Sequence, residues 1–186
     1  MKKIFLILIL IISQSCKKSI DKKSVDVEYE IENLKTTTDK NNYLEYIYDL
    51  DQKIRNGESS ELLVNFGESS IQYQNFLFKM DSIDNLNYER IDLFLMNFNY
   101  PNKDSVSKKA VSSPWLVIHH NSDNKKRKKH FKKLLQAYEN ENIDVDQFDL
   151  YLRRTYRIEF GENLSWEGAY NPDDKIDWMI KEMNFE

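Results

Sequence analysis

The segment Pro114-Trp115-Leu116-Val117-Ile118-His119-His120 is the most apolar stretch of the chain after its first 15 residues. A short apolar run is typical of a protein interior, but periodicity alone does not separate a buried helix from a buried strand. We favour a helix, because Ser113 can cap its first turn with Pro114 at the first helical position. No other segment is a convincing partner strand. The sequence therefore predicts that Trp115 to Ile118 lies in the core, as a helix or, alternatively, as a strand.

Apolar residues recur at helical spacing ahead of this segment. Tyr43 to Ile54 carries one such stripe, and Gly57 is placed to close that helix as a C-cap would. A second helix is expected over 61–81, where Ile83-Asp84-Asn85 then interrupts the pattern. A third is expected over 88–97.

Three further helices are expected towards the C-terminus. Lys125 to Glu139 places its apolar side chains on one face and its lysines on the other. Asp144 and Gln147 have the spacing of a capping box, which begins the next helix. Pro172 to Met183 forms the last one. The expected fold class is therefore mostly α, a single helical domain of about six or seven helices over residues 41–186.

The composition fits one domain with a real core and excludes several classes of function. The 186 residues are 40% hydrophobic with only 4 glycines and 3 prolines, which favours long helices over a barrel of many strands. A formal net charge of −4 argues against a nucleic-acid partner. The single cysteine excludes an intramolecular disulfide and every cysteine-based zinc site. No His-x-x-x-His motif or Gly-rich phosphate loop is present, so we expect no metal and no cofactor.

The N-terminus has the pattern of an export signal. Lys2-Lys3 precedes the apolar run Ile4 to Ile12, which is about half the ~20 residues that a membrane-spanning helix requires. Ser13-Gln14-Ser15-Cys16 follows, and a lone cysteine at this place resembles the lipobox of bacterial lipoproteins. The resemblance implies a signal peptide over residues 1–15 and acylation of Cys16, with palmitate-class chains as the membrane anchor. The alternative is an ordinary secretory signal with an incidental cysteine.

Residues 16–40 are polar and rich in Ser, Thr, Lys and Asp, so we expect a tether between the lipid and the domain. Within it, Val25 to Ile31 alternates apolar and charged residues, which leaves a short strand as an alternative. The residues directly after Cys16 are basic, and this favours the periplasmic face of the outer membrane. The expected location is the bacterial cell envelope, with membrane lipid as a partner through the acylated cysteine.

Several short elements follow one another along residues 41–184: Asp51-Gln52 and Arg55, Asn85 and Arg90, Tyr100-Pro101, Leu116 to His120, and Pro172-Asp173 with Ile176-Asp177. In this order they resemble the domain of unknown function 6624, an uncharacterised bacterial family. The apolar run of that family ends in Gln-His, so the resemblance gives His120 the place of the family histidine and His119 that of the glutamine. Because the family has no established activity, the resemblance implies a fold more than a function.

Two elements depart from the family pattern. The family usually carries an Asp-Arg pair where this chain has Arg153-Arg154, and a Tyr-Gly-Thr-Gln element where it has Leu164-Ser165-Trp166-Glu167. If these elements form the family's site, the resemblance implies an altered or lost activity in this member.

His120 is the strongest candidate for chemistry. An imidazole titrates near neutral pH, so at the end of an apolar run it can serve as a general acid or base. Asp51, Arg55 and Arg90 are candidates to join it as supporting polar groups. The alternatives are a histidine at the edge of the core that bonds only to backbone, and an Asp51–Arg55 surface ion pair at i and i+4. His119 points about 100° away from His120 on a helix, so the two cannot share a face.

A basic run follows the histidines and includes Lys125, Lys126, Lys128 and Lys129. It can dock on anionic lipid headgroups, at about 1 kcal/mol per residue near the surface; a solvated helix face is the alternative. Together these features predict an envelope lipoprotein that is a binding or interaction module for an unknown protein or small molecule. The competing hypothesis is an enzyme of unknown reaction that uses His120.

Overall fold

The computed structural model describes residues 26–164 and 171–185, which are helical apart from short connections. The helices are α1 (Val27–Glu32), α2 (Thr37–Ile54), α3 (Glu58–Phe66), α4 (Ile71–Phe98), α5 (Lys108–His120), α6 (Asn124–Lys129), α7 (Phe131–Glu139), α8 (Val145–Phe160) and α9 (Pro172–Glu182). No strand occurs in this part of the chain, so the prediction of a mostly α single domain is confirmed. The described helices outnumber the six or seven that the sequence predicts, because α1 is added and the expected helix over 125–139 is divided into α6 and α7.

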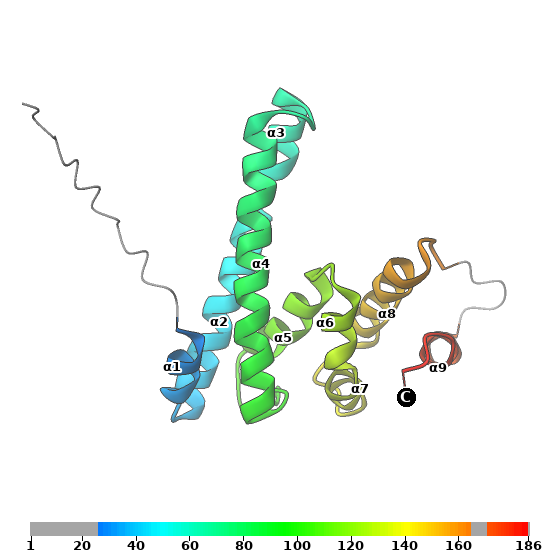
Figure 1. Ribbon diagram of the computed structural model, residues 1–186. Coiled ribbons are helices and arrows are strands. Elements are labelled where there is room, and N and C mark those ends of the chain that lie inside the picture. The colour runs from blue at the N-terminus through cyan, green and yellow to red at the C-terminus, as the bar shows by residue number, and fades with distance from the viewer. Residues whose placement is uncertain (1–25, 165–170, 186) are drawn as a thin grey trace, which may run out of the picture.

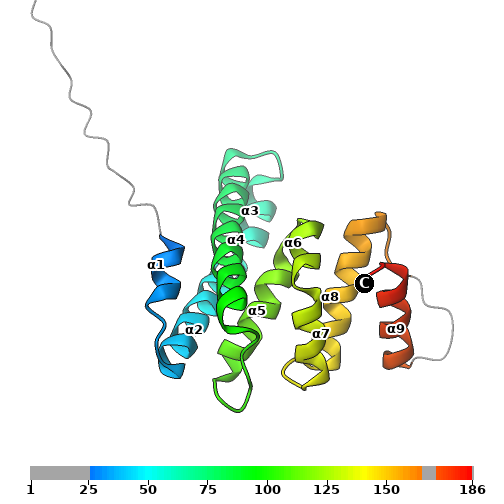
Figure 2. The ribbon, with the colours of Figure 1, turned by 60° about the horizontal axis from the view of Figure 1, so that its bottom comes forward.

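The helices follow one another across the molecule in chain order, from α1 and α2 at one end to α9 at the other (Figure 1, Figure 2). The N-terminal part of α4 extends past the other helices, and α3 packs along this part (Figure 1). We call α3 together with residues 71–80 of α4 the tip, and the rest of the described chain the body.

α5 is the central helix of the body. It packs against α2, α4, α6 and α8, and its residues from Ser113 to Ile118 are all buried. The helix begins where the Ser107 hydroxyl accepts a hydrogen bond from the Ala110 amide. Ile118 is fully buried, which contributes about 2 kcal/mol relative to leaving it exposed. The favoured prediction of a buried helix for this segment is therefore correct.

The predicted start of that helix at Ser113 and Pro114 is wrong. Pro114 lies in the second turn of α5, and because proline has no amide hydrogen, the Ala110 carbonyl lacks its usual donor one turn later. The added first turn offsets this loss, since it buries Ala110 and Val111 in the body. The Tyr100 hydroxyl also donates to the Val111 carbonyl at 2.8 Å.

The folded domain begins earlier than expected. α1 occupies part of the expected tether, and its Val27 and Ile31 are buried. These two residues are four apart, so the alternation that suggested a strand also fits one face of a helix. α2 in turn begins with a capping box formed by Thr36 and Asp39. The expected tether and the alternative strand are therefore wrong for residues 26–40.

The tip departs from the expected helix boundaries. α4 runs unbroken through Ile83-Asp84-Asn85, and the interruption lies between Phe66 and Ile71 instead. Arg55 binds the Asp84 carboxylate, which therefore does not compete for backbone hydrogen bonds of the helix. Gly57 does not cap α2; it precedes α3 with a φ of 103°, a conformation that favours glycine.

The expected helix from Lys125 to Glu139 is two helices, and His130 separates them. The His130 ring is buried, and its Nε2 lies 2.6 Å from Asp92 Oδ1 on α4. A contact so distant in sequence leaves no trace in the local periodicity. The capping box of Asp144 and Gln147 does begin α8 as predicted. α9 also forms where expected.

Candidate functional site

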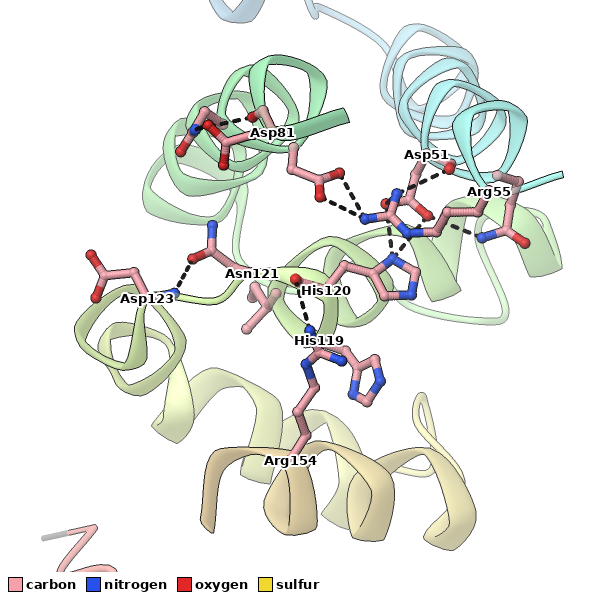
Figure 3. A network of polar contacts seen from close by, with 12 residues as sticks. Asp51, Arg55, Asp81, His119, His120, Asn121, Asp123 and Arg154 are labelled. Carbon is pink, nitrogen blue, oxygen red and sulfur yellow. Dashed lines mark hydrogen bonds and ion pairs between the residues drawn. The ribbon is translucent and has the colours of Figure 1, made fainter. Parts of the chain in front are cut away.

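His120 and Asp51 form a close pair between α5 and α2 (Figure 3). The Nδ1 atom of His120 lies 3.0 Å from each carboxylate oxygen of Asp51. The Asp51 side chain is 1% exposed, and that of His120 is 20% exposed. Because α2 and α5 pack on each other through buried residues, this packing fixes the position of one side chain relative to the other.

Two more side chains hold the Asp51 carboxylate. The Arg55 guanidinium donates to Oδ1 at 2.9 Å, and the Gln52 amide donates to Oδ2 at 3.0 Å. Arg55 also donates to both oxygens of Asp84 on α4, at 2.7 and 2.8 Å (Figure 3). Burial raises the pKa of Asp84, and the guanidinium opposes that shift. The Asp51–Arg55 ion pair is thus part of a network that joins three helices, and its Asp51 side is buried.

Arg90 does not join this network. It is 3% exposed on the face of α4 that meets α1, where Nε and Nη2 each donate to Glu30 at 2.9 Å. The hydrogen bond from Arg90 lowers the pKa of Glu30, although burial opposes the shift. The structure therefore brings together His120, Asp51 and Arg55 and places Arg90 elsewhere. The expectation that all four converge is wrong for Arg90, because its partner lies in the segment taken for a tether.

A cavity of about 430 Å³ opens beside His120, between α2, α4, α8 and the connection from α5 to α6. Its walls are mainly polar or charged and include Arg55, Asp84, Asp123, Lys126 and Arg154. Among the residues that the structure describes, no hydrogen bond involves His120 Nε2.

This arrangement can move a proton. A carboxylate on Nδ1 holds a neutral imidazole with its proton on that atom, so that Nε2 presents a lone pair. Nε2 can then accept a proton from water or from a substrate hydroxyl, and the buried Asp51 carboxylate stabilises the imidazolium that results. The remaining charges of the cavity can orient a small polar molecule.

His119 lies in a different environment from its neighbour. Its ring stacks on Trp115, with the ring centroids 5.2 Å apart and the planes 19° from parallel. Burial lowers the pKa of His119 to about 3, and nearby Arg127 adds to the shift. The Nδ1 atom is buried and has no hydrogen-bond partner among the described residues. His119 is therefore a neutral side chain at physiological pH.

Arg127, which the sequence did not single out, fixes the end of α5. It is fully buried, and its guanidinium donates to a set of acceptors on α5, α8 and the loop after α5: the carbonyls of Ile118, His119, Asn121 and Tyr151 and the hydroxyl of Thr155. The last carbonyls of a helix lack partners within it and favour a cation. Arg127 thereby positions the two histidines. Its only sequence signal is that it is the one arginine among the lysines of 125–133.

The lysines of the basic run are largely engaged within the fold. Lys126 donates to Asn85, Lys128 pairs with Glu159 and Lys129 pairs with Asp92. Lys125 is exposed, and among the described residues it is the one of the four with no side-chain partner.

Other predicted features fall outside the described residues or leave the site unchanged. Cys16 and the apolar run before it lie outside 26–164 and 171–185, as do residues 165–167 of the second departure from the family. None of the described helices is long and apolar enough to cross a membrane. Within the same residues, no three His, Cys, Asp or Glu side chains gather closely enough to hold a metal ion.

The fold and the site together define an all-helical domain with a buried Asp–His pair beside a polar cavity. The model of the family of unknown function DUF6624 matches residues 46–174, and the chain belongs to that family. Asp51, Arg55 and His120 all lie within the matched region. No curated protein and no solved structure is significantly similar to the chain.

Proposed function

We propose that this domain is an enzyme in which His120 acts as a general acid and base on a small polar molecule held in the cavity beside it. The main support is the 3.0 Å contact of His120 Nδ1 with both oxygens of the buried Asp51. His120 Nε2 is left without a hydrogen-bond partner among the described residues. Asp51 orients the ring, Arg55 and Gln52 hold Asp51, and water or a substrate hydroxyl is the group that loses a proton to Nε2.

The protonation state of His120 tests this proposal without knowledge of the substrate. In nitrogen NMR spectra of the histidine-labelled chain, we expect the neutral ring to carry its proton on Nδ1. Asp51→Asn should remove this preference, because a neutral amide no longer favours a donor on Nδ1. Asp49→Asn is the matched control, since Asp49 lies on the same helix but is exposed and pairs with Lys109. A proton on Nε2 in the unchanged chain would contradict the proposed role.

The reaction itself can be sought with a panel of chromogenic substrates: phosphate esters, carboxylate esters and glycosides. His120→Asn should lower any turnover by about 10²-fold to 10⁴-fold, the range for loss of a general acid or base. Equal turnover by His120→Asn and the unchanged chain would exclude His120 as a general acid or base for that class of substrate.

We also propose that the chain is an envelope lipoprotein anchored by an acylated Cys16. The support is the position of the only cysteine directly after the apolar run Ile4 to Ile12. With α1 beginning at Val27, the nine residues 17–25 and Asp26 separate the anchor from the folded domain, which is then held close to the membrane. If the basic run docks on that membrane, Lys125 should contribute most. Cys16→Ser should release the protein to the soluble fraction and abolish labelling by a palmitate analogue; a variant still wholly membrane-bound would refute the anchor.

A binding or interaction module is the second candidate function, and the tip favours it. Several large apolar side chains are exposed there: Leu63, Val64, Phe66, Ile71 and Phe78. Exposed apolar patches on soluble domains often mark interaction sites. The variant Ile71→Ser, Phe78→Ser should abolish such an interaction and leave the His120 tautomer unchanged, which separates this function from the first.

A further inference from the structure

A second cavity, of about 330 Å³, is lined by residues of α8, by the end of α5 and by the two residues 163–164 that follow α8. Arg154 lines both cavities, but the charged side chains of this one are all cationic: Arg153, Arg154 and Arg157. The uncharged walls include His119 and Asn163. No Asp or Glu is among its described lining residues, in contrast to the cavity beside His120.

Within the described residues, two of the three arginines lack an anionic partner. Arg153 pairs with Asp149 at 2.7 Å one turn earlier. Arg154, by contrast, makes one long hydrogen bond of 3.4 Å, to the His120 carbonyl, and its Nε is buried without a partner. Arg157 is exposed, and no hydrogen bond or ion pair of its side chain occurs within the described residues. Of the three arginines, Arg153 is therefore the one whose charge is paired with a carboxylate of the described residues.

This arrangement has an energetic cost that an anion would remove. Arg154 and Arg157 are three residues apart on one helix, where like charges repel each other. Burial lowers the pKa of Arg154, and Arg157 and Arg55 lower it further. A guanidinium presents parallel N–H donors that fit a phosphate or carboxylate, and the neutral His119 ring can add one N–H donor.

We propose that this cavity binds a phosphate group, with Arg154 and Arg157 as its principal ligands and His119 as an uncharged third donor. Two guanidinium cations match the charge of a phosphate monoester dianion better than that of a single carboxylate, and a phosphodiester headgroup would neutralise one of them. The cavity also exceeds a lone phosphate in size, so a phosphorylated small molecule or a phospholipid headgroup fits it. The inference goes beyond the acid–base role of His120 and does not depend on it.

Isothermal titration of the full chain with inorganic phosphate, glycerol 3-phosphate and glycerophosphoglycerol tests the proposal. The last is the water-soluble headgroup of phosphatidylglycerol and represents a lipid source; the first two represent free phosphate. We expect saturable binding of at least one probe, and about tenfold or weaker affinity in Arg157→Gln and in Arg154→Gln, as for loss of about 1.4 kcal/mol of binding energy. Arg157→Gln is the more decisive variant, because the exposed side chain makes no hydrogen bond or ion pair within the described residues.

Two controls give the result its meaning. Lys132→Gln removes an equal charge from an exposed position outside the lining of the cavity, and it should bind every probe as the unchanged chain does. Arg157→Lys keeps the charge without the paired donors and should lie between Arg157→Gln and the unchanged chain. Tighter binding of glycerophosphoglycerol than of the other probes assigns the lipid source, and the reverse order assigns a free phosphate. Affinity that is unchanged in both Arg154→Gln and Arg157→Gln, or no saturable binding of any of the three probes, would overturn the site. Neither outcome bears on the tautomer of His120.

Discussion

Phe78 in the tip is 76% exposed, whereas Arg127 in the body is fully buried. The usual preferences of the two residue types are thus reversed. Arg127 is stable in the interior because carbonyl and hydroxyl oxygens accept hydrogen bonds from its guanidinium. In the tip, α3 contributes no buried residue, and Leu63 and Phe66, whose helical spacing suggests an inward face, are exposed. The body therefore draws stability from a buried polar side chain that is fully hydrogen-bonded, and the exposed face of the tip adds little to global stability.

The largest effect should follow from Arg127→Met, which keeps the volume but leaves buried acceptors at the end of α5 unpaired. Each such acceptor costs about 1–3 kcal/mol, so we expect a loss of at least about 3 kcal/mol in urea unfolding. Lys128→Met is the matched control, because Lys128 makes a partly exposed pair with Glu159 worth less than about 1 kcal/mol and a cation–π contact with Phe185 at 5.5 Å. Equal losses for the two variants would show that Arg127 does not stabilise the body.

Arg90→Met should have the next largest effect, about 2 kcal/mol, because it leaves Glu30 without its cationic partner at the contact of α1 with α4, and among the described residues only the Tyr43 hydroxyl still donates to its carboxylate. The expected value is below that of a fully buried pair, since the Glu30 side chain is 27% exposed. The double variant Arg90→Met, Glu30→Gln should recover part of the loss. The NMR signals of His120 should not change; a change would return Arg90 to the candidate site.

Acidification should have the third largest effect, a loss in the unfolding free energy of the body. The folded pKa values of His119 and His130 lie below the ordinary 6.5 because burial disfavours the charged ring. The unfolded chain therefore takes up protons that the folded chain excludes, so stability is fullest above pH 6.5 and falls as the pH drops below it. Each histidine adds a slope of at most about 1.4 kcal/mol per pH unit. His119→Phe keeps the stack on Trp115 and should reduce the slope of unfolding free energy against pH; an unchanged slope would contradict the neutral state of His119.

The smallest effect should come from the exposed face of the tip. Phe78→Ala should change the unfolding free energy by less than about 0.5 kcal/mol, because an exposed side chain loses little on truncation. Phe76 lies two residues earlier and is 4% exposed, so Phe76→Ala should cost about 3 kcal/mol. Similar losses in thermal or urea unfolding would mean that the exposed face of the tip is covered in solution.

Local signals were sufficient for part of the fold. The capping box of Asp144 and Gln147 depends on residues three apart and predicts the start of α8 correctly. The burial of Trp115 to Ile118 also follows from composition. The start of α5 could not be predicted, because the gain from burying Ala110 and Val111 depends on helices elsewhere in the chain.

The candidate site shows the same limit. The i, i+4 spacing of Asp51 and Arg55 predicts their ion pair, and the resemblance to the family points to His120. The contact between Asp51 and His120 spans 69 residues, and that between Arg90 and Glu30 spans 60. Only the packing of the helices decides which of these distant polar groups meet. Sequence spacing therefore predicts the contact within one helix and misses the partners that other helices supply.

The stack of Trp115 on His119 supplies an optical signal beside the second cavity, which His119 lines. The indole nitrogen donates to the Gln147 carbonyl at 2.7 Å, so the ring is held in one orientation. The emission of a tryptophan responds to charge and hydrogen bonding at the ring beside it. Protonation of His119, or a phosphate placed against it, should therefore alter the fluorescence of Trp115. Replacement of Trp178 by Phe would remove one background emitter, and the molecule would then report its own ligand without an attached dye.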